Sequence, residues 1–452
     1  MSTNDFGLSG DQVKALDKQH VFHSWSAQAA LDPMAIERGE GSYVWDYDGN
    51  RYLDFGSQLV NVNIGHQHPK LVAAIQDQAA RMCTIAPSVA NDVRSEAARR
   101  ITEVAPEKLT KVFFTNGGAE ANEYAIRLAK GHTGRPKILT TYRSYHGATT
   151  GAIGLTGDPR RWANEPVTHG TVHFWGPYPY RSQFHSDSPE QETERALQHL
   201  RDVVMVEGPQ TIAAIMLETV VGTNGILVPP PGYLAGVREI CDEHGIVMIA
   251  DEVMSGFGRC GQWFAIDAWD VAPDLISFAK GVNSGYVPLG GVVIHEDIAA
   301  SYDEKPFPGG LTYSGHPLAC ASAVASMRIF EEEDILGHVR RMAQDVYEPR
   351  LRELADRHPS VGDVRGIGAF WALELVRDRE TREPLVPFNA TAADAAPMAQ
   401  FAAACKQRGL LPFTHFNRTH VVPPCTTTKE EALEGIAILD EALKVADEHY
   451  TG

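Results

Sequence analysis

From about residue 70 onward, short continuous apolar segments alternate with stretches of helical pattern, and this alternation limits the possible folds more than any other feature. The segments are residues 111–115, 137–141, 213–217, 246–250, 275–278 and 291–294. Continuous apolar strands separated by helices are typical of a mainly parallel sheet that helices cover on both faces. We therefore predict an α/β fold. Ligand-binding residues of such a sheet lie beyond the carboxyl ends of its strands.

The two ends of the chain predict a second, smaller domain. Around Asp48-Gly49-Asn50, aromatic residues alternate on both sides of a turn, which predicts a β-hairpin. The elements predicted near the C-terminus are helices at 345–357, 391–408 and 429–447 and a strand at 368–374. We expect residues 71–334 to form the large domain. Residues 1–70 and 335–452 would together form a small α+β domain.

Composition narrows the kind of partner. A formal net charge of −18 disfavours nucleic acid and anionic membranes, because both need a basic surface. The N-terminus lacks the pattern of a signal peptide, and no apolar run is long enough to span a membrane. The 6 cysteines form no Cys-x-x-Cys pair, and the histidines lack metal-ligand spacing, so no metal site is predicted. We expect a soluble, cytoplasmic protein that acts on small molecules.

Lys280 follows the apolar segment 275–278 and precedes a glycine. A lysine in a sheltered turn has a depressed pKa and can act as a Schiff-base nucleophile. Asp251 ends the segment 246–250, and Glu218 ends the segment 213–217. A buried carboxylate at a strand end needs a cationic or hydrogen-bonding partner, and a protonated pyridine nitrogen is one such partner. For a single aspartate, a cap or an ion pair between domains is the alternative.

Two turns supply further candidates. Gly117-Gly118-Ala119 joins the segment 111–115 to a helical stretch, so its amides and the helix N-terminus could bind a phosphate. Tyr145 and His146 follow the segment 137–141, and the tyrosine ring could stack on a flat heterocycle. Taken singly, these features are also explained by a tight connection and by loop packing.

The order of these features along the chain carries more information than any one of them. The most specific stretches are Ile249-Ala-Asp-Glu-Val-Met-Ser-Gly-Phe-Gly-Arg259, Phe278-Ala-Lys-Gly281 and Gly310-Leu-Thr-Tyr-Ser-Gly-His-Pro317. With them the chain resembles the class III pyridoxal-phosphate aminotransferases of fold type I, also called the omega-aminotransferase family. The resemblance extends from the hairpin near Tyr43 to the helix that ends near Ala446.

This resemblance implies pyridoxal 5′-phosphate as the cofactor, held as an aldimine on Lys280, with Asp251 at the pyridine nitrogen. It places Val253 and Tyr145 on the two ring faces. The other cofactor contacts that it implies are Gly117, Gly118, Ala119, His146, Glu218 and Thr312. For Glu218, a purely structural carboxylate is the alternative. Thr312 would bind the phosphate of the neighbouring subunit, which implies a homodimer and leaves a tetramer open.

The implied activity is a ping-pong transamination, in which an amine donor gives its amino group to the enzyme and a keto acid then receives it. The sequence departs from the family at several points. The phosphate turn lacks the usual serines, and Cys260 replaces a threonine. Thr223 occupies a position where 2-oxoglutarate-using members have a glutamate that gates an arginine. The loss of this glutamate argues against the 2-oxoglutarate-using branch, and the stretches 223–233 and 285–290 resemble the taurine or beta-alanine to pyruvate enzymes.

The sequence indicates the residues of the substrate pocket less clearly than those of the cofactor site. Arg418 is the arginine available to bind the acceptor carboxylate, although its register differs from the family's and a surface position is the alternative. Trp25 and Val60 are further pocket candidates, with core packing as the alternative for each. An aminomutase, a decarboxylase or a 2-oxoglutarate-using 4-aminobutyrate aminotransferase remains an alternative activity. A binding protein without catalysis and a nicotinamide dehydrogenase fit the motifs less well.

Overall fold

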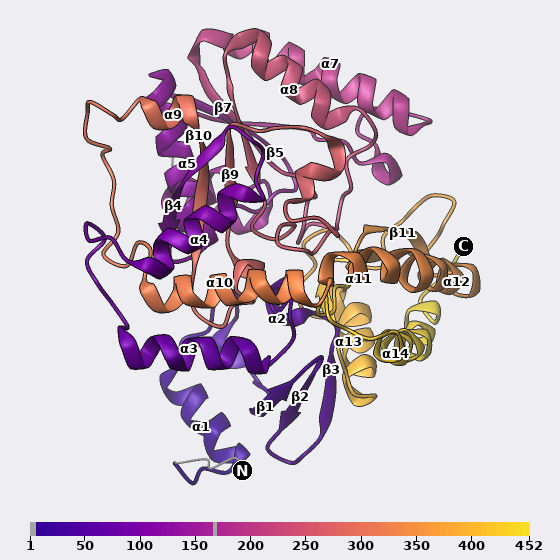
Figure 1. The fold of residues 1–452 in the computed structure, drawn as a ribbon. Coiled ribbons are helices and arrows are strands. Elements are labelled where there is room, and N and C mark those ends of the chain that lie inside the picture. The colour runs from indigo at the N-terminus through magenta and orange to yellow at the C-terminus, as the bar shows by residue number, and fades with distance from the viewer. Residues whose placement is uncertain (1–5, 166–169) are drawn as a thin grey trace.

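The computed structural model describes residues 6–165 and 170–452, and its largest element is a seven-stranded sheet (Figure 1). The strand order is β4-β10-β9-β8-β7-β5-β6. The strands are β4 (Leu109–Thr115), β5 (Lys137–Thr141), β6 (Thr171–Phe174), β7 (Ile212–Glu218), β8 (Val247–Asp251), β9 (Leu275–Phe278) and β10 (Gly290–His295). Strand β10 runs antiparallel to β4 and β9, and the other pairs are parallel. The predicted mainly parallel sheet is therefore confirmed.

Helices cover both faces of this sheet because its central strands are apolar on both sides. All seven residues of β7 are buried. Ile215 and Leu217 belong to the core on one face, whereas Ala214 and Met216 belong to the core on the other. The helices around the sheet are α4 (Asp92–Glu103), α5 (Gly118–Thr133), α6 (Thr150–Leu155), α7 (Pro189–Glu207), α8 (Tyr233–His244), α9 (Glu296–Ala300) and α10 (Pro317–Glu332), and α3 (Pro69–Arg81) packs against α10. This alternation is the period-2 geometry of a strand buried between two layers.

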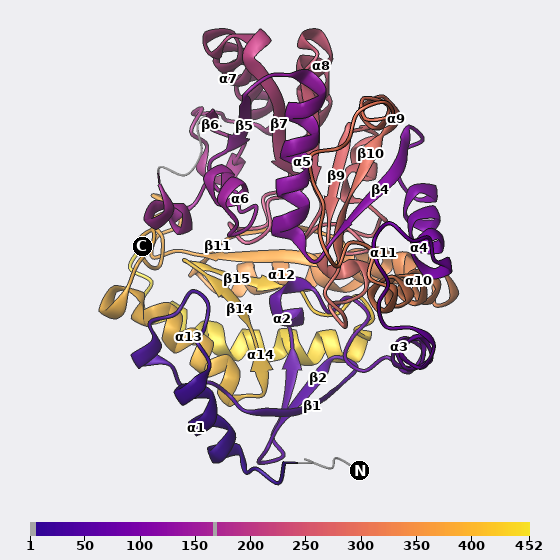
Figure 2. The ribbon, with the colours of Figure 1, turned by 90° about the vertical axis from the view of Figure 1, so that its left-hand side faces the viewer.

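A second body forms from the two ends of the chain, which lie side by side below the large sheet in Figure 2. One four-stranded sheet contains β11 (Val361–Ile367), β12 (Phe370–Leu375), β15 (Arg418–Val421) and β14 (Phe413–His415). The other contains β1 (Ile36–Glu40), β2 (Tyr43–Asp46), β3 (Arg51–Asp54) and β13 (Leu410–Leu411). The helices of this body are α1 (Gly10–His20), α2 (Ser57–Val60), α11 (Ile335–Met342), α12 (Glu348–Arg357), α13 (Ala396–Gln407) and α14 (Lys429–Asp447).

Several predicted elements have the expected type and place. Strands β2 and β3 form the hairpin predicted around Asp48-Gly49-Asn50, and α14 spans the predicted helix at its C-terminal end. The predicted strand at 368–374 begins later, at Phe370, because Gly368 has a φ of +62° and turns the chain. Strand β6 has no counterpart among the predicted elements.

The predicted division into 1–70, 71–334 and 335–452 remains a prediction. The core around the large sheet includes Met327, whereas Ile329 and Phe330, also in α10, belong to the core of the second body. Helix α10 therefore contributes to both cores. In the part of the chain that the structure describes, no helix is long and apolar enough to cross a membrane.

Candidate active site

The large sheet brings the predicted lysine and carboxylates to one edge. Glu218 is the last residue of β7 and pairs in register with Asp251, the last residue of β8. Asp251 in turn pairs with Ser277 of β9. Lys280 lies just beyond the end of β9 and begins a short 3₁₀ helix with a φ of +46°. Because these strands are parallel neighbours, their carboxyl ends place Glu218, Asp251 and Lys280 together.

Asp251 is buried and held by three hydrogen bonds. Its Oδ2 accepts from Asn122 Nδ2 at 2.7 Å and lies 2.7 Å from His146 Nδ1. Its Oδ1 accepts from the Val253 N–H at 3.0 Å. A carboxylate has about four lone-pair sites, so Asp251 retains acceptor capacity for a further donor. The network fixes the carboxylate and leaves it able to bind a cationic nitrogen.

His146 belongs to the network around Asp251, and its predicted contact with the cofactor remains a prediction. Its Nδ1 faces Asp251, and its Nε2 lies 3.1 Å from Thr140 Oγ1. His146 is fully enclosed. The imidazole therefore orients Asp251 from behind.

Lys280 has the electrostatics expected of a nucleophilic amine. Burial lowers its pKa to about 8, and the nearby carboxylates of Glu218 and Asp251 oppose this shift. Its side chain nevertheless remains partly accessible. A lysine of this pKa is partly neutral near pH 7 and can both attack a carbonyl and carry a proton.

Glu218 is a buried carboxyl group with backbone partners. It accepts hydrogen bonds from the N–H groups of Tyr145 and Gly222, both at 2.8 Å. Burial and the charge of Asp251 raise the pKa of Glu218 to about 7, although His146 and the backbone donors oppose the rise. The side chain therefore ties the Tyr145 loop to the end of β7. Its predicted contact with the cofactor remains a prediction.

The predicted phosphate turn opens α5. Among the described residues, the N–H groups of Gly118 and Ala119 have no protein acceptor, as expected for the first turn of a helix. A Cβ atom at Gly118 would lie 2.6 Å from Val253 Cγ1. Glycine at this position is therefore required for Val253 to pack against the start of α5.

Tyr145 forms an aromatic wall with two neighbours. The Trp25 ring meets it edge-on at 6.3 Å between centroids. The Arg160 guanidinium lies 3.7 Å from the centroid of the Tyr145 ring. Arg160 also forms an ion pair with Asp158, with its Nε 3.1 and 3.0 Å from the two carboxylate oxygens. Trp25 is 59% exposed and thus lies at the outer side of this wall.

Four other predicted residues occupy different settings. Val60 is buried in a core with Phe370, as the packing alternative proposed, and Thr223 is buried beside Gly222. Thr312 is exposed in the single chain. Arg418 is buried in β15, where its Nη1 donates to the Asn224 carbonyl at 2.9 Å and its Nε lies 3.6 Å from Glu374. Their predicted roles remain predictions.

Residues 25–443 match the family model described as aminotransferase class-III. The chain belongs to this family. Within the described residues of this aminotransferase, no group of three or more His, Cys, Asp or Glu side chains could hold a metal ion.

Similar proteins share both sequence and fold. A putrescine–pyruvate aminotransferase of Pseudomonas aeruginosa is 37% identical, over 82% of this chain and 84% of its own. A taurine–pyruvate aminotransferase of Bilophila wadsworthia is 33% identical, over 97% and 98%. A taurine:2-oxoglutarate aminotransferase from Bifidobacterium kashiwanohense, solved with pyridoxal phosphate (PLP) and glutamate, is 42% identical with a TM-score of 0.94, over 98% and 99%.

This aminotransferase uses pyridoxal 5′-phosphate to carry out transamination. The described residues fit that cofactor. A partly accessible lysine of lowered pKa suits its aldehyde, and a fixed carboxylate with acceptor capacity suits its ring nitrogen. The free amides at the start of α5 suit its phosphate. When bound, the cofactor supplies an electron sink for the carbon that loses its proton.

Three residues near the site were not among the predicted site residues. Asn122 lies one turn into α5, and its helical spacing from the phosphate turn was the available signal. Arg160 lies in a short 3₁₀ helix (Pro159–Asn164) after α6 that Asp158 caps, and no motif or period indicates that these side chains face the site.

Proposed function

We propose that this aminotransferase moves the amino group of an omega-amino acid or an aminosulfonate to pyruvate by a ping-pong mechanism. The observation that carries the proposal is the position of Arg160, which covers Tyr145 and is one of two arginines whose charge acts on the pKa of Lys280. The other, Arg259, is fully buried and donates to the Ala369 carbonyl and to Asn63. Arg160 is thus the arginine available to a substrate.

A guanidinium is suited to bind carboxylate and sulfonate, because its planar fork donates two parallel hydrogen bonds. Asp158 holds Arg160 when no substrate acid is present, and Asn224 Nδ2 donates to Asp158 at 3.0 Å. The site therefore offers one orienting cation for one acid group. Pyruvate has a single carboxylate, whereas 2-oxoglutarate has a second one that needs a second anchor.

Arg418 is the predicted second anchor, and its surroundings in the fold make it the weaker candidate. It is engaged by the Asn224 carbonyl and lies near Glu374. Thr223 supplies no carboxylate to gate an arginine. Both features support pyruvate as the acceptor.

The residues of the chain have distinct proposed tasks. Asp251, held by Asn122 and His146, keeps the cofactor ring nitrogen protonated. Val253 and Tyr145 enclose the ring, and Gly117-Gly118-Ala119 binds the phosphate through backbone amides. Lys280 holds the aldehyde and, when released, carries the proton from the substrate carbon.

We expect Arg160→Gln to raise the KM of taurine or beta-alanine by about 10- to 100-fold, because a charge-assisted contact is lost. The KM of an amine without an acid group, such as 1-phenylethylamine, should change little. Steady-state kinetics with both donors measures the difference.

Arg418→Ala is the matched comparison. If this variant, and not Arg160→Gln, raises the KM of the acidic substrates selectively, Arg418 is the anchor and the Arg160 assignment is wrong. If a variant raises the KM equally for amines with and without an acid group, the arginine replaced in that variant is not the anchor.

A second acceptor has specific support. The similar structure at 42% identity is named a taurine:2-oxoglutarate aminotransferase. Initial rates with taurine and either keto acid decide between the acceptors. We expect a higher kcat/KM with pyruvate, and a higher value with 2-oxoglutarate would overturn the proposed acceptor.

We further propose that the enzyme is a cytoplasmic homodimer, in which Thr312 binds the cofactor phosphate of the partner subunit. Thr312 is exposed in the single chain, as a residue that reaches another subunit would be. The cysteines Cys83, Cys241, Cys260, Cys320, Cys405 and Cys425 are free thiols, which suits a reducing compartment.

Thr312→Ala should weaken cofactor binding by about 10- to 100-fold, through loss of one charge-assisted hydrogen bond. Equilibrium dialysis against pyridoxal phosphate measures the change, and the neighbouring exposed Tyr313→Phe serves as the control. An unaltered cofactor affinity, or a monomer in sedimentation that binds the cofactor equally well, would disprove the shared site.

A further inference from the structure

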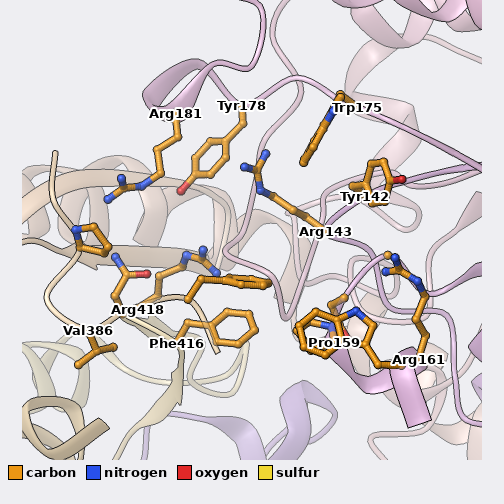
Figure 3. A pocket seen from close by; sticks show the side chains of 16 residues that line it. Tyr142, Arg143, Pro159, Arg161, Trp175, Tyr178, Arg181, Val386, Phe416 and Arg418 are labelled. Carbon is orange, nitrogen blue, oxygen red and sulfur yellow. The ribbon is translucent and has the colours of Figure 1, made fainter. Parts of the chain in front are cut away.

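A separate cavity of about 370 Å³ lies between the large sheet body and the β14–β15 hairpin (Figure 3). Its walls come from four stretches of the chain, residues 142–162, 175–181, 384–388 and 416–418. Neither Lys280, Asp251 nor Tyr145 lines it. The cavity has the size of a small-molecule pocket, for which the usual range begins at about 300 Å³.

Arg143 is the central side chain of this cavity. In Figure 3 its guanidinium projects between Trp175, Tyr178 and Arg418. It lies 5.0 Å from the ring centroids of both Trp175 and Tyr178. In the described part of the chain, no carboxylate lies within ion-pair distance of Arg143, and its side chain makes no hydrogen bond. Arg143 is partly buried beside these rings and has no protein acceptor, so an anion bound in the cavity would complete its surroundings.

The neighbouring charges do not supply that anion. Glu374 is the carboxylate at this end of the cavity, and it is shared among Arg181, Arg365 and Arg418. Asp363 pairs with Arg365. Two carboxylates thus serve three arginines, so this end of the cavity carries excess positive charge.

The other titratable groups around the cavity are already engaged. Asp158 forms an ion pair with Arg160, and Arg161 pairs with Glu165 at 2.8 Å. The Arg418 Nε is buried without a hydrogen-bond acceptor. Among the described residues, Arg143 therefore remains as the principal donor for a bound acid, and the Arg418 Nε is a second donor beside its contacts to Glu374 and Asn224.

The apolar walls define the rest of the ligand. Besides Trp175 and Tyr178, the rings of Tyr142, Phe388 and Phe416 line the space, together with Val386. Such walls favour a flat or branched apolar body and exclude a small, strongly hydrated ion.

We infer that this cavity binds an organic anion, an aryl or branched alkyl carboxylate or sulfonate, whose acid group is held by Arg143 and Arg418. The site is distinct from the transamination site, with Asp158 as a shared wall, since Asp158 lines the cavity and also binds Arg160. The inference does not depend on which acceptor the enzyme uses.

Isothermal titration of the holoenzyme with 3-phenylpropanoate, and with 3-phenylpropanol as its uncharged counterpart, tests the inference. We expect the acid to bind at least about tenfold more tightly than the alcohol. Arg143→Gln should weaken binding of the acid by at least about tenfold, whereas Arg161→Gln, a lining arginine with its own carboxylate partner, should change it by less than about threefold.

Competition and folding controls complete the experiment. Saturating taurine should leave the affinity for 3-phenylpropanoate unchanged, and full displacement by taurine would show that the cavity belongs to the substrate site. Equal affinity for acid and alcohol, absence of binding to the wild type, or equal losses in both arginine variants would each overturn the inference.

Circular dichroism and thermal unfolding verify that Arg143→Gln is folded, and Arg143→Lys, which keeps the charge, should retain part of the affinity.

Discussion

Lys280→Ala is expected to reduce transamination by about 10⁴-fold or more, since one substitution removes the amine that we propose both holds the cofactor aldehyde and carries the proton. The chain places this amine at the end of β9, where burial lowers its pKa to about 8. After borohydride reduction of the holoenzyme, intact mass should show one cofactor adduct per subunit, mapped to the peptide with Lys280. The variant should show none.

Lys130→Ala is the matched control. Burial also lowers the pKa of Lys130, which lies in α5 away from the strand ends. Its removal should leave the adduct and the rate in place. A borohydride-stable adduct on the Lys280→Ala variant, or near-normal turnover by it, would contradict the assignment.

Asp251→Asn is expected to lower kcat/KM by about 10³-fold. At about 4 Å and an effective dielectric near 20, a carboxylate and a pyridinium attract by about 4 kcal/mol. Each 1.36 kcal/mol corresponds to about tenfold in rate, so loss of this attraction accounts for about three orders of magnitude. The asparagine side chain preserves the shape and can still meet Asn122 and His146, so the folded state should persist. Stopped-flow rates of the half-reaction with taurine measure the effect.

Glu252→Gln separates catalysis from structure. Glu252 is the next residue and is fully buried, but its carboxyl group accepts from Thr219 Oγ1, Ser255 Oγ and the N–H groups of Ala265 and Ile266. Burial raises its pKa to about 7, so a neutral amide resembles its protonated form. This control should affect thermal stability far more than the half-reaction. Equal kinetic losses in both variants would mean that Asp251 has no special role at the ring nitrogen.

The site residues that could be predicted from the sequence are those whose positions follow from local sequence patterns. Asp251 and Lys280 follow apolar strands of a parallel sheet, and such strands have their carboxyl ends at one edge. The glycine turn before α5 is local as well. Order along the chain was therefore enough to predict that these groups meet.

The remaining part depends on side-chain direction across long sequence separations. Arg160 reaches Tyr145 from a short 3₁₀ helix, and no periodicity of the sequence predicts which way its side chain points. Arg418 lies in a hairpin strand whose register puts it against Glu374 of β12. Val60 is in the core because its neighbours from four distant segments enclose it. Such contacts are set by tertiary packing, which a single sequence does not display.

The second body, which the two ends of the chain form, shows the same difference between local and long-range contacts. The turn at Asp48-Gly49-Asn50 is local and was predicted. Strand β13 pairs with β3, and Leu410 lies opposite Leu53, so the pairing links opposite ends of the chain. The sequence predicted that both ends share a domain, but not that these two strands pair.

The most direct test of the central claim is a single-turnover experiment without keto acid. Holoenzyme mixed with taurine or beta-alanine should release about one carbonyl product per active site and then stop, because the amino group stays on the enzyme. Subsequent addition of pyruvate should yield an equal amount of alanine. Continued turnover of the amine in the absence of any keto acid, or no carbonyl release at all, would contradict the account of this chain as an omega-amino acid aminotransferase.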